Sequence, residues 1–143
     1  VVRMADAVAS RLRAAGVRAR TVTVKVRFAD FSTITRSHTL AAPVDTAQAL
    51  AGVAVELLEA VDVDPGVRLL GVSASGLMPS QGEQLSLEDA VSDWERADWE
   101  DVARAVDQIR SRFGAKAVGP AALAGAGELR VKRPGDTQWG PAK

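Results

Sequence analysis

Residues 21–28 read Thr-Val-Thr-Val-Lys-Val-Arg-Phe, and this stretch decides the fold. Apolar and polar side chains alternate strictly along it, and a period of two residues is that of a β-strand. Successive side chains of a strand point to opposite faces, so Val22, Val24, Val26 and Phe28 would face a core. A strand with one polar face is typical of an antiparallel sheet that is covered on one side only.

The flanking segments have patterns that complete an α+β domain. Apolar residues at helical spacing predict helices over residues 1–15 and 47–60. Residues 32–40 are rich in threonine and β-branched side chains and predict the second strand of a hairpin, which Pro43 would end. Residues 67–77 predict a third strand. We therefore expect an antiparallel β-sheet with two helices on one face.

Length and composition exclude several classes of protein. The chain has 143 residues, no cysteine and a formal net charge of zero. This length suits one domain with a tail, and the lack of cysteine excludes disulfides, thiolate metal sites and a cysteine nucleophile. The apolar runs are broken by charges well before the roughly 18 residues that a membrane span needs. We expect no membrane partner and a cytoplasmic location.

Charge is distributed unevenly along the chain. Residues 1–77 hold 9 basic and 7 acidic side chains, residues 78–111 hold 3 and 9, and residues 112–143 hold 6 and 2. These shifts and the Pro, Gly and Ala content divide the chain into four parts. The parts are a domain over residues 1–77, an acidic linker over 78–98, an amphipathic helical region over 99–118 and a basic tail over 119–143.

The helical region after the linker carries one apolar stripe. Its members recur at helical spacing, and Gly114 follows them where a helix would end. They are Trp99, Val102, Val106, Ile109 and Phe113. We expect this stripe to pack on protein.

The polar side of the predicted sheet is the first candidate site. It offers hydroxyl groups and cations with almost no apolar surface, and such groups bind phosphate oxygens without reading base sequence. Its side chains are those of Thr21, Thr23, Lys25, Arg27, Thr33, Thr35, Ser37, Thr39, Ser73 and Ser75. On the pattern alone, a face that is merely solvated is the favoured interpretation.

Two longer stretches resemble a known family, and this resemblance favours phosphate binding over a merely solvated face. Residues 20–40 read Arg-Thr-Val-Thr-Val-Lys-Val-Arg-Phe-Ala-Asp-Phe-Ser-Thr-Ile-Thr-Arg-Ser-His-Thr-Leu, and residues 67–77 read Val-Arg-Leu-Leu-Gly-Val-Ser-Ala-Ser-Gly-Leu. Residues 1–77 resemble the little-finger domain of the Y-family DNA polymerases, in particular the bacterial DNA polymerase IV group. The resemblance implies a four-stranded sheet with two helices behind it, in the order βαββαβ. The first strand of that order would precede Val1, so we expect this chain to lack it.

The resemblance also implies a role in translesion DNA synthesis. In that family the little-finger strands lie along the major groove and hold the backbones of template and primer, so primer-template DNA is the expected partner. The predicted DNA-backbone contacts include the two cations of the polar face. They are Lys25, Arg27, Thr35, Arg36, Ser37, His38, Thr39, Arg68, Gly71, Ser73 and Ser75. His38 and Ser73 stand where the family commonly has arginine, so we expect a weaker grip.

Residues 84–87 form the second candidate site. They read Gln-Leu-Ser-Leu in the acidic linker and resemble the short motif with which bacterial polymerases bind the β sliding clamp. Gln84 would reach backbone groups of the clamp, while Leu85 and Leu87, on either side of Ser86, would fill an apolar pocket. An acidic residue follows where the strongest motifs have an aromatic one. Residues 86–89, Ser-Leu-Glu-Asp, also fit the alternative of a capping box that opens a helix.

The sequence shows no catalytic constellation. The sequence contains neither a dinucleotide-binding nor a phosphate-loop motif, and we place its only histidine, His38, on the polar face of the sheet. We therefore predict no catalytic residue, metal site or cofactor in this chain, which should be inactive alone. Mg²⁺ and the catalytic domains would belong to the full-length, error-prone polymerase. The alternative is a protein-interaction adaptor with no intrinsic DNA role, and a free-standing small enzyme is the least supported class.

Overall fold

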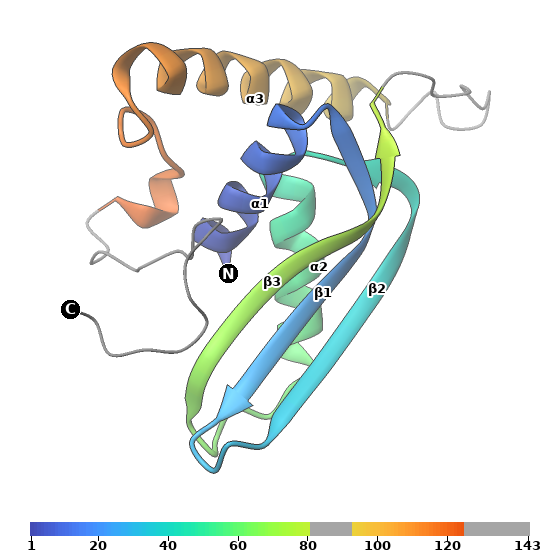
Figure 1. Ribbon diagram of the computed structural model, residues 1–143, viewed down its shortest axis with the longest axis vertical. Coiled ribbons are helices and arrows are strands. Elements are labelled where there is room, and N and C mark those ends of the chain that lie inside the picture. The colour runs from blue at the N-terminus through green and yellow to red at the C-terminus, as the bar shows by residue number, and fades with distance from the viewer. Residues whose placement is uncertain (81–92, 125–143) are drawn as a thin grey trace.

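An antiparallel sheet in the order β2-β1-β3 forms the centre of the molecule (Figure 1). The structure is a computed structural model that describes residues 1–80 and 93–124. Within these residues, the elements in chain order are α1 (Val2–Ala14), β1 (Val17–Phe28), β2 (Thr33–Val44), α2 (Ala47–Glu59), β3 (Val67–Pro79), α3 (Asp93–Phe113) and the short 3₁₀ helix η2 (Ala121–Leu123). The predicted α+β fold class is confirmed.

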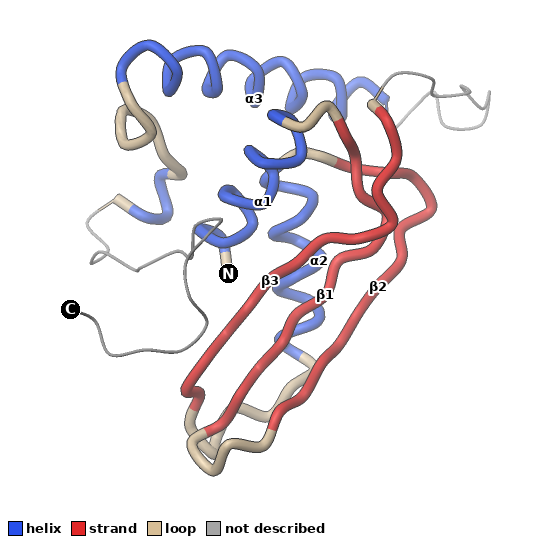
Figure 2. Tube along the Cα trace, in the orientation of Figure 1, coloured by secondary structure: helices blue, strands red, loops and turns tan. Residues whose placement is uncertain are grey.

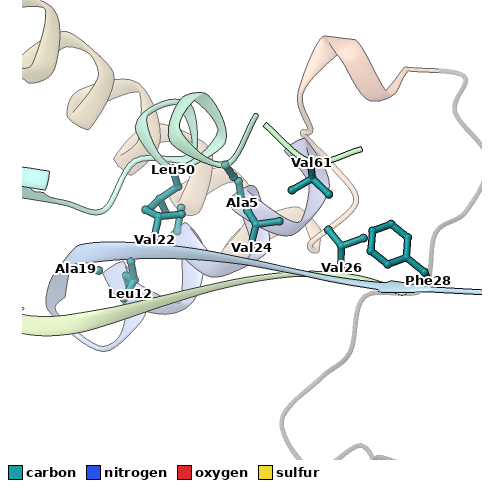
Figure 3. Close-up of a cluster of buried hydrophobic side chains, with 11 residues drawn as sticks. Ala5, Leu12, Ala19, Val22, Val24, Val26, Phe28, Leu50 and Val61 are labelled. Carbon is teal, nitrogen blue, oxygen red and sulfur yellow. The ribbon is translucent and has the colours of Figure 1, made fainter. Parts of the chain in front are cut away.

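The hydrophobic core lies between the sheet and two helices. Helices α1 and α2 pack against each other and cover one face of the sheet, α1 over β1 and β3 and α2 over β1 and β2 (Figure 2). The largest fully buried side chains are Val22, Val24, Val26 and Leu50, each at most 1% exposed (Figure 3). Full burial of one such side chain contributes about 1.5 to 3 kcal/mol. The alternation in β1 therefore assigned the core side correctly.

Strand β2 is longer than the sequence predicted. We expected Pro43 to end this strand, but β2 continues through it. Because β2 is an edge strand, a proline there removes no hydrogen bond that the sheet needs. The pairing of β2 with β1 shifts register near this end. Arg20 bridges the irregularity by donating hydrogen bonds to the carbonyl oxygens of Leu40 at 3.3 Å and Ala41 at 3.2 Å.

Helix α3 crosses over one end of α1 and is attached there by ion pairs (Figure 1). Arg13 donates from Nε and Nη2 to the two carboxylate oxygens of Asp107, at 2.6 and 3.0 Å. Arg110 makes the same forked contact with Asp6, at 2.9 and 3.2 Å. A contact of 3.0 Å joins Arg18 of β1 to α3 through Glu100. Forked arginine-carboxylate pairs are among the stronger and more directional polar contacts in proteins.

This attachment differs from the predicted one. The apolar stripe of α3 was expected to pack on protein, but Trp99 is 46%, Val102 51% and Phe113 73% exposed. The residues that meet α1 and β1 are instead Glu100, Asp107 and Arg110, whose spacing also places them on one helical face. The stripe packs on the domain only in part, since Val106 is half-buried and Trp99 lines a pocket with residues of α2. The ion pairs with the rest of the domain come from the charged face of α3.

The variant Asp107→Asn tests this charged attachment. It removes the carboxylate charge that faces Arg13 and preserves the size of the side chain. Both partners are largely buried, so we expect α3 to open more easily by about 1 kcal/mol or more, seen as at least roughly fivefold faster amide hydrogen exchange in α3. The control is Asp101→Asn, whose exposed partner is Arg104 and whose effect should stay within about 0.5 kcal/mol. Equal exchange in the two variants would contradict the attachment described here.

Candidate nucleic-acid interface

The strand registers arrange the polar side chains of the uncovered sheet face into rows. From Thr21 to Arg27, each polar position of β1 has one residue of β2 and one of β3 directly opposite. Neighbours of this kind have Cβ atoms about 4.5 to 5.5 Å apart, so the rows form one continuous surface. The four rows are Thr39, Thr21 and Ser75; Ser37, Thr23 and Ser73; Thr35, Lys25 and Gly71; and Thr33, Arg27 and Leu69. We call this surface the open face.

The open face presents hydrogen-bonding groups to solvent. Helices α1 and α2 lie on the opposite side of the sheet (Figure 2). The predicted contacts Lys25, Thr35, Ser37, Thr39, Ser73 and Ser75 are exposed on it, and Arg27 is half-buried. The hydroxyl groups of Thr21 and Thr39 share a hydrogen bond of 3.0 Å. Hydroxyl groups interspersed with cations can bind a phosphodiester backbone without distinguishing bases.

Gly71 exposes backbone in the middle of the open face. It lies directly opposite Lys25. Its φ is not positive, and an added Cβ would meet only the carbonyl oxygen of Lys25 at 4.0 Å, an ordinary contact. The fold therefore does not require glycine here. The missing side chain lets a ligand approach the backbone of β3 beside a cation.

Two predicted contacts lie on the other face of β2. The register places His38 opposite Val22 and Arg36 opposite Val24, and both valines are buried on the core side. The interpretation that put His38 on the polar face is therefore wrong, because five consecutive residues of a strand cannot all face one way. Arg36 and His38 are nevertheless exposed at the sheet edge. Their contact with DNA stays a prediction.

The predicted contact Arg68 lies at the end of the sheet, in a cluster with an aromatic ring. The pairing of β1 with β3 shifts register near the end of β1, and Arg68 has no partner in that register. Such bulges re-aim side chains. The guanidinium carbons of Arg68 and Arg27 lie 4.7 and 5.2 Å from the ring centre of Phe31. Phe31 was not among the predicted contacts, although an aromatic residue inside a short polar turn is a recognisable signal.

Hydrogen bonds hold the turn that carries Phe31. The carboxylate of Asp30 accepts hydrogen bonds from the Ser32 hydroxyl at 2.6 Å and the Ser32 N–H at 2.9 Å. The Ala29 N–H donates to the carbonyl of Gly66 at 3.0 Å, which ties this turn to the turn before β3. Phe31 consequently keeps a φ of 69°, a left-handed conformation that bulky residues rarely adopt. The hydroxyl and then the N–H of Ser32 hold the pKa of Asp30 below its ordinary value.

Other predictions concern features away from the sheet. Among the side chains that the structure describes, those of residues 1–80 and 98–124, no three His, Asp or Glu are grouped so that they could hold a metal ion. In the same part of the chain, no helix is long and apolar enough to cross a bilayer. The proposed clamp-binding residues Gln84, Leu85, Ser86 and Leu87 lie outside the described residues.

Several known proteins are similar to this chain in sequence. A family model described as the impB/mucB/samB family C-terminal domain matches residues 1–87. DNA polymerase IV 2 of Mesorhizobium japonicum is 42% identical over 127 residues, which cover 81% of this chain and 31% of that protein. DNA polymerase IV of Streptomyces coelicolor is 49% identical over 83 residues, 58% of this chain and 17% of that protein. DNA polymerase IV of Desulfatibacillum aliphaticivorans is 40% identical over 122 residues, which cover 84% of this chain and 30% of that protein. The chain spans less than a third of the length of each relative.

The pKa of Asp30 provides a test of the turn geometry. Its carboxyl should titrate below an ordinary aspartate, and Ser32→Ala should raise its pKa, because the hydroxyl is the largest cause of the lowering. Since the folded-state pKa is lowered, the contribution to stability is present at neutral pH and is lost as pH falls through that pKa. An NMR pH titration of the carboxyl carbon measures this. Ser37→Ala, on β2, should leave the titration unchanged, and an unchanged pKa in Ser32→Ala would show that the turn is built differently.

Proposed function

The chain belongs to the impB/mucB/samB C-terminal domain family, as part of a Y-family DNA polymerase of the DNA polymerase IV kind, and on this premise we propose that its open face holds primer-template DNA. Contacts would run along the phosphate backbones and be independent of base sequence. The observation that carries the proposal is the alignment of hydroxyl groups, Lys25, Arg27 and the bare backbone at Gly71 in cross-strand rows on one uncovered face.

The charges of this surface set its expected affinity. Lys25 and Arg27 lie in the open-face rows, and Arg68 lies at the end of the sheet. Each phosphate neutralised by a cation adds about 0.9 to the slope of log affinity against log salt concentration, so these three cations imply a slope of about −3. Arg36 would add to this only if the DNA backbone also passes the outer edge of β2. The chain as a whole has no net charge, so binding should be moderate and strongly sensitive to salt.

We assign catalysis to other parts of the parent polymerase. Nucleotidyl transfer by such an enzyme needs Mg²⁺ held by carboxylates, and the described residues of this chain offer no such group. In this proposal the chain positions DNA for catalytic domains elsewhere in the parent and cannot extend a primer alone. The parent would carry out error-prone translesion synthesis on chromosomal DNA, which would place it in the cytoplasm.

We also propose that residues 84–87 bind the β sliding clamp. The end of β3 is fixed nearby, because the N–H and the hydroxyl of Ser80 both donate to the carbonyl of Gly16, at 3.0 and 2.9 Å. Gln84 follows Ser80 by four residues, and four extended residues span at most about 14 Å. A clamp bound through this motif would thus stay close to the open face and to its DNA.

The alternative function is a protein-interaction adaptor. The observation in its favour is the exposed apolar stripe of α3, with Trp99, Val102 and Phe113. Such a surface would bind a protein partner through apolar burial, which salt does not weaken steeply. Salt dependence therefore separates the two functions.

The DNA-binding proposal predicts the behaviour of two glycine variants. In a fluorescence-polarisation titration with a labelled primer-template duplex, the unmodified chain should bind duplexes of unrelated sequence equally, with a salt slope of about −3. Gly71→Ala should weaken binding about fivefold, roughly 1 kcal/mol, because the methyl group blocks the backbone, while the melting temperature stays the same or rises slightly. Gly52→Ala, at a position on α2 with open space around it, is the matched control and should leave binding unchanged. Failure to bind duplex even at low salt would refute the proposal.

The clamp proposal predicts that Gln84→Ala combined with Leu87→Ala reduces binding to purified β clamp at least about tenfold. The variant loses one apolar anchor and one hydrogen-bonding side chain, which together contribute at least the roughly 1.4 kcal/mol that corresponds to a tenfold change in affinity. Surface plasmon resonance with immobilised clamp measures the effect. The double variant should bind primer-template duplex like the unmodified chain. Unchanged clamp affinity would exclude this motif as the contact.

A further inference from the structure

An exposed aromatic ring lies at the end of the sheet, outside the hydrophobic core. Phe31 is 55% exposed, and Val67 and Leu69, which flank Arg68 at the start of β3, are 45% and 49% exposed. The ring is nevertheless held in place, because the turn is fixed by Asp30 and by its hydrogen bond to the turn before β3. A bulky residue kept at a positive φ without burial is typical of a binding function rather than of a folding role.

Two guanidinium groups lie over this ring in cation–π contacts. Arg27 comes from β1 and Arg68 from the bulged start of β3, and they lie 5.2 and 4.7 Å from the ring centre. Guanidinium planes stack on nucleobases as aromatic rings do, and they also bind phosphate oxygens. The cluster of Phe31, Arg27 and Arg68, which we call the tip cluster, therefore combines the two chemistries that single-stranded nucleic acid requires.

The tip cluster is continuous with the open face. Arg27 belongs both to the cluster and to the last open-face row, in which it lies between Thr33 and Leu69. A DNA backbone that follows the rows toward this end leaves the hydroxyl-lined rows and meets an aromatic ring. The carboxylate of Asp30 stays negatively charged, because the hydrogen bonds from Ser32 do not neutralise it, and the two guanidinium groups outweigh this single negative charge.

We infer that the tip cluster binds an unpaired nucleotide of a strand that continues beyond the duplex. Its base stacks on Phe31 and the guanidinium planes, and its phosphate is bound by Arg27 and Arg68. This inference rests on the proposed duplex binding and identifies the single-stranded part of the same ligand as a second contact. Stacking of one base on such a platform corresponds to roughly a tenfold gain in affinity, without preference for a particular base.

The test compares three labelled DNAs with the complete 143-residue chain. The first is a blunt duplex, the second carries an overhang of four thymidines, and the third carries an overhang of four abasic nucleotides with the same phosphates. We expect the thymidine overhang to raise affinity about tenfold and the abasic overhang to raise it about twofold or less. If the abasic overhang gives the same gain as thymidine, the bases are not stacked and the inference is overturned.

Variants locate the gain in the tip cluster. Phe31→Leu keeps an apolar side chain but removes the ring, and it should abolish the gain from the thymidine overhang while changing blunt-duplex affinity less than about twofold. Phe31→Tyr should retain the gain. Phe113→Leu, at a more exposed phenylalanine on α3, is the matched control and should behave like the unmodified chain. A full gain in Phe31→Leu would mean that the bases are bound elsewhere on the chain, and it would overturn the inference.

Failure of duplex binding would be distinguishable from failure of the tip. If the blunt duplex does not bind, the open-face proposal is refuted, and free oligothymidine is then compared with an abasic strand of the same length. Binding of oligothymidine that Phe31→Leu abolishes would support the tip cluster on its own. The inference would be overturned if the two strands bound equally or if neither strand bound.

Discussion

The burial of Val22, Val24 and Val26 beneath α1 and α2 is the interaction on which the rest of the structure depends. These side chains lie on the central strand, which pairs with a neighbour along each edge. Because every second residue of β1 is used by the core, the residues between them must point to the opposite side. A shift by one residue would bury Lys25 and expose the valines, so the hydrophobic core fixes the composition of the open face as firmly as it fixes the fold.

The alternation that sets the core was visible in the sequence, and so was most of the open face. The placement of Arg36 and His38 was not correctly predicted, because the resemblance applies to a continuous run of residues, whereas the two sides of a strand divide that run between two environments. The end of β2 was also misjudged. Pro43 breaks a central strand but not an edge strand, and position within a sheet depends on pairings that no local pattern reveals.

Contacts between distant parts of the chain explain the remaining differences. The residues of the ion pairs on α1 and α3 lie 94 and 104 positions apart, and each taken alone looks like an ordinary surface charge. The surroundings of Phe31 depend likewise on a bulge in β3 that brings Arg68 to the ring. Helical periodicity identified the apolar stripe of α3, but periodicity cannot indicate which face of a helix finds complementary partners.

The charged attachment of α3 has a consequence for how such domains diverge. The family model matches residues 1–87, and α3 begins after that segment, at Asp93. Helix α3 contributes none of its described side chains to the hydrophobic core and is attached by ion pairs, so its sequence can change without repacking that core. The domain and this helix are then free to change in sequence at different rates. Differences between relatives of this chain should accumulate in this helix, where they can change the choice of partner at little cost to the fold.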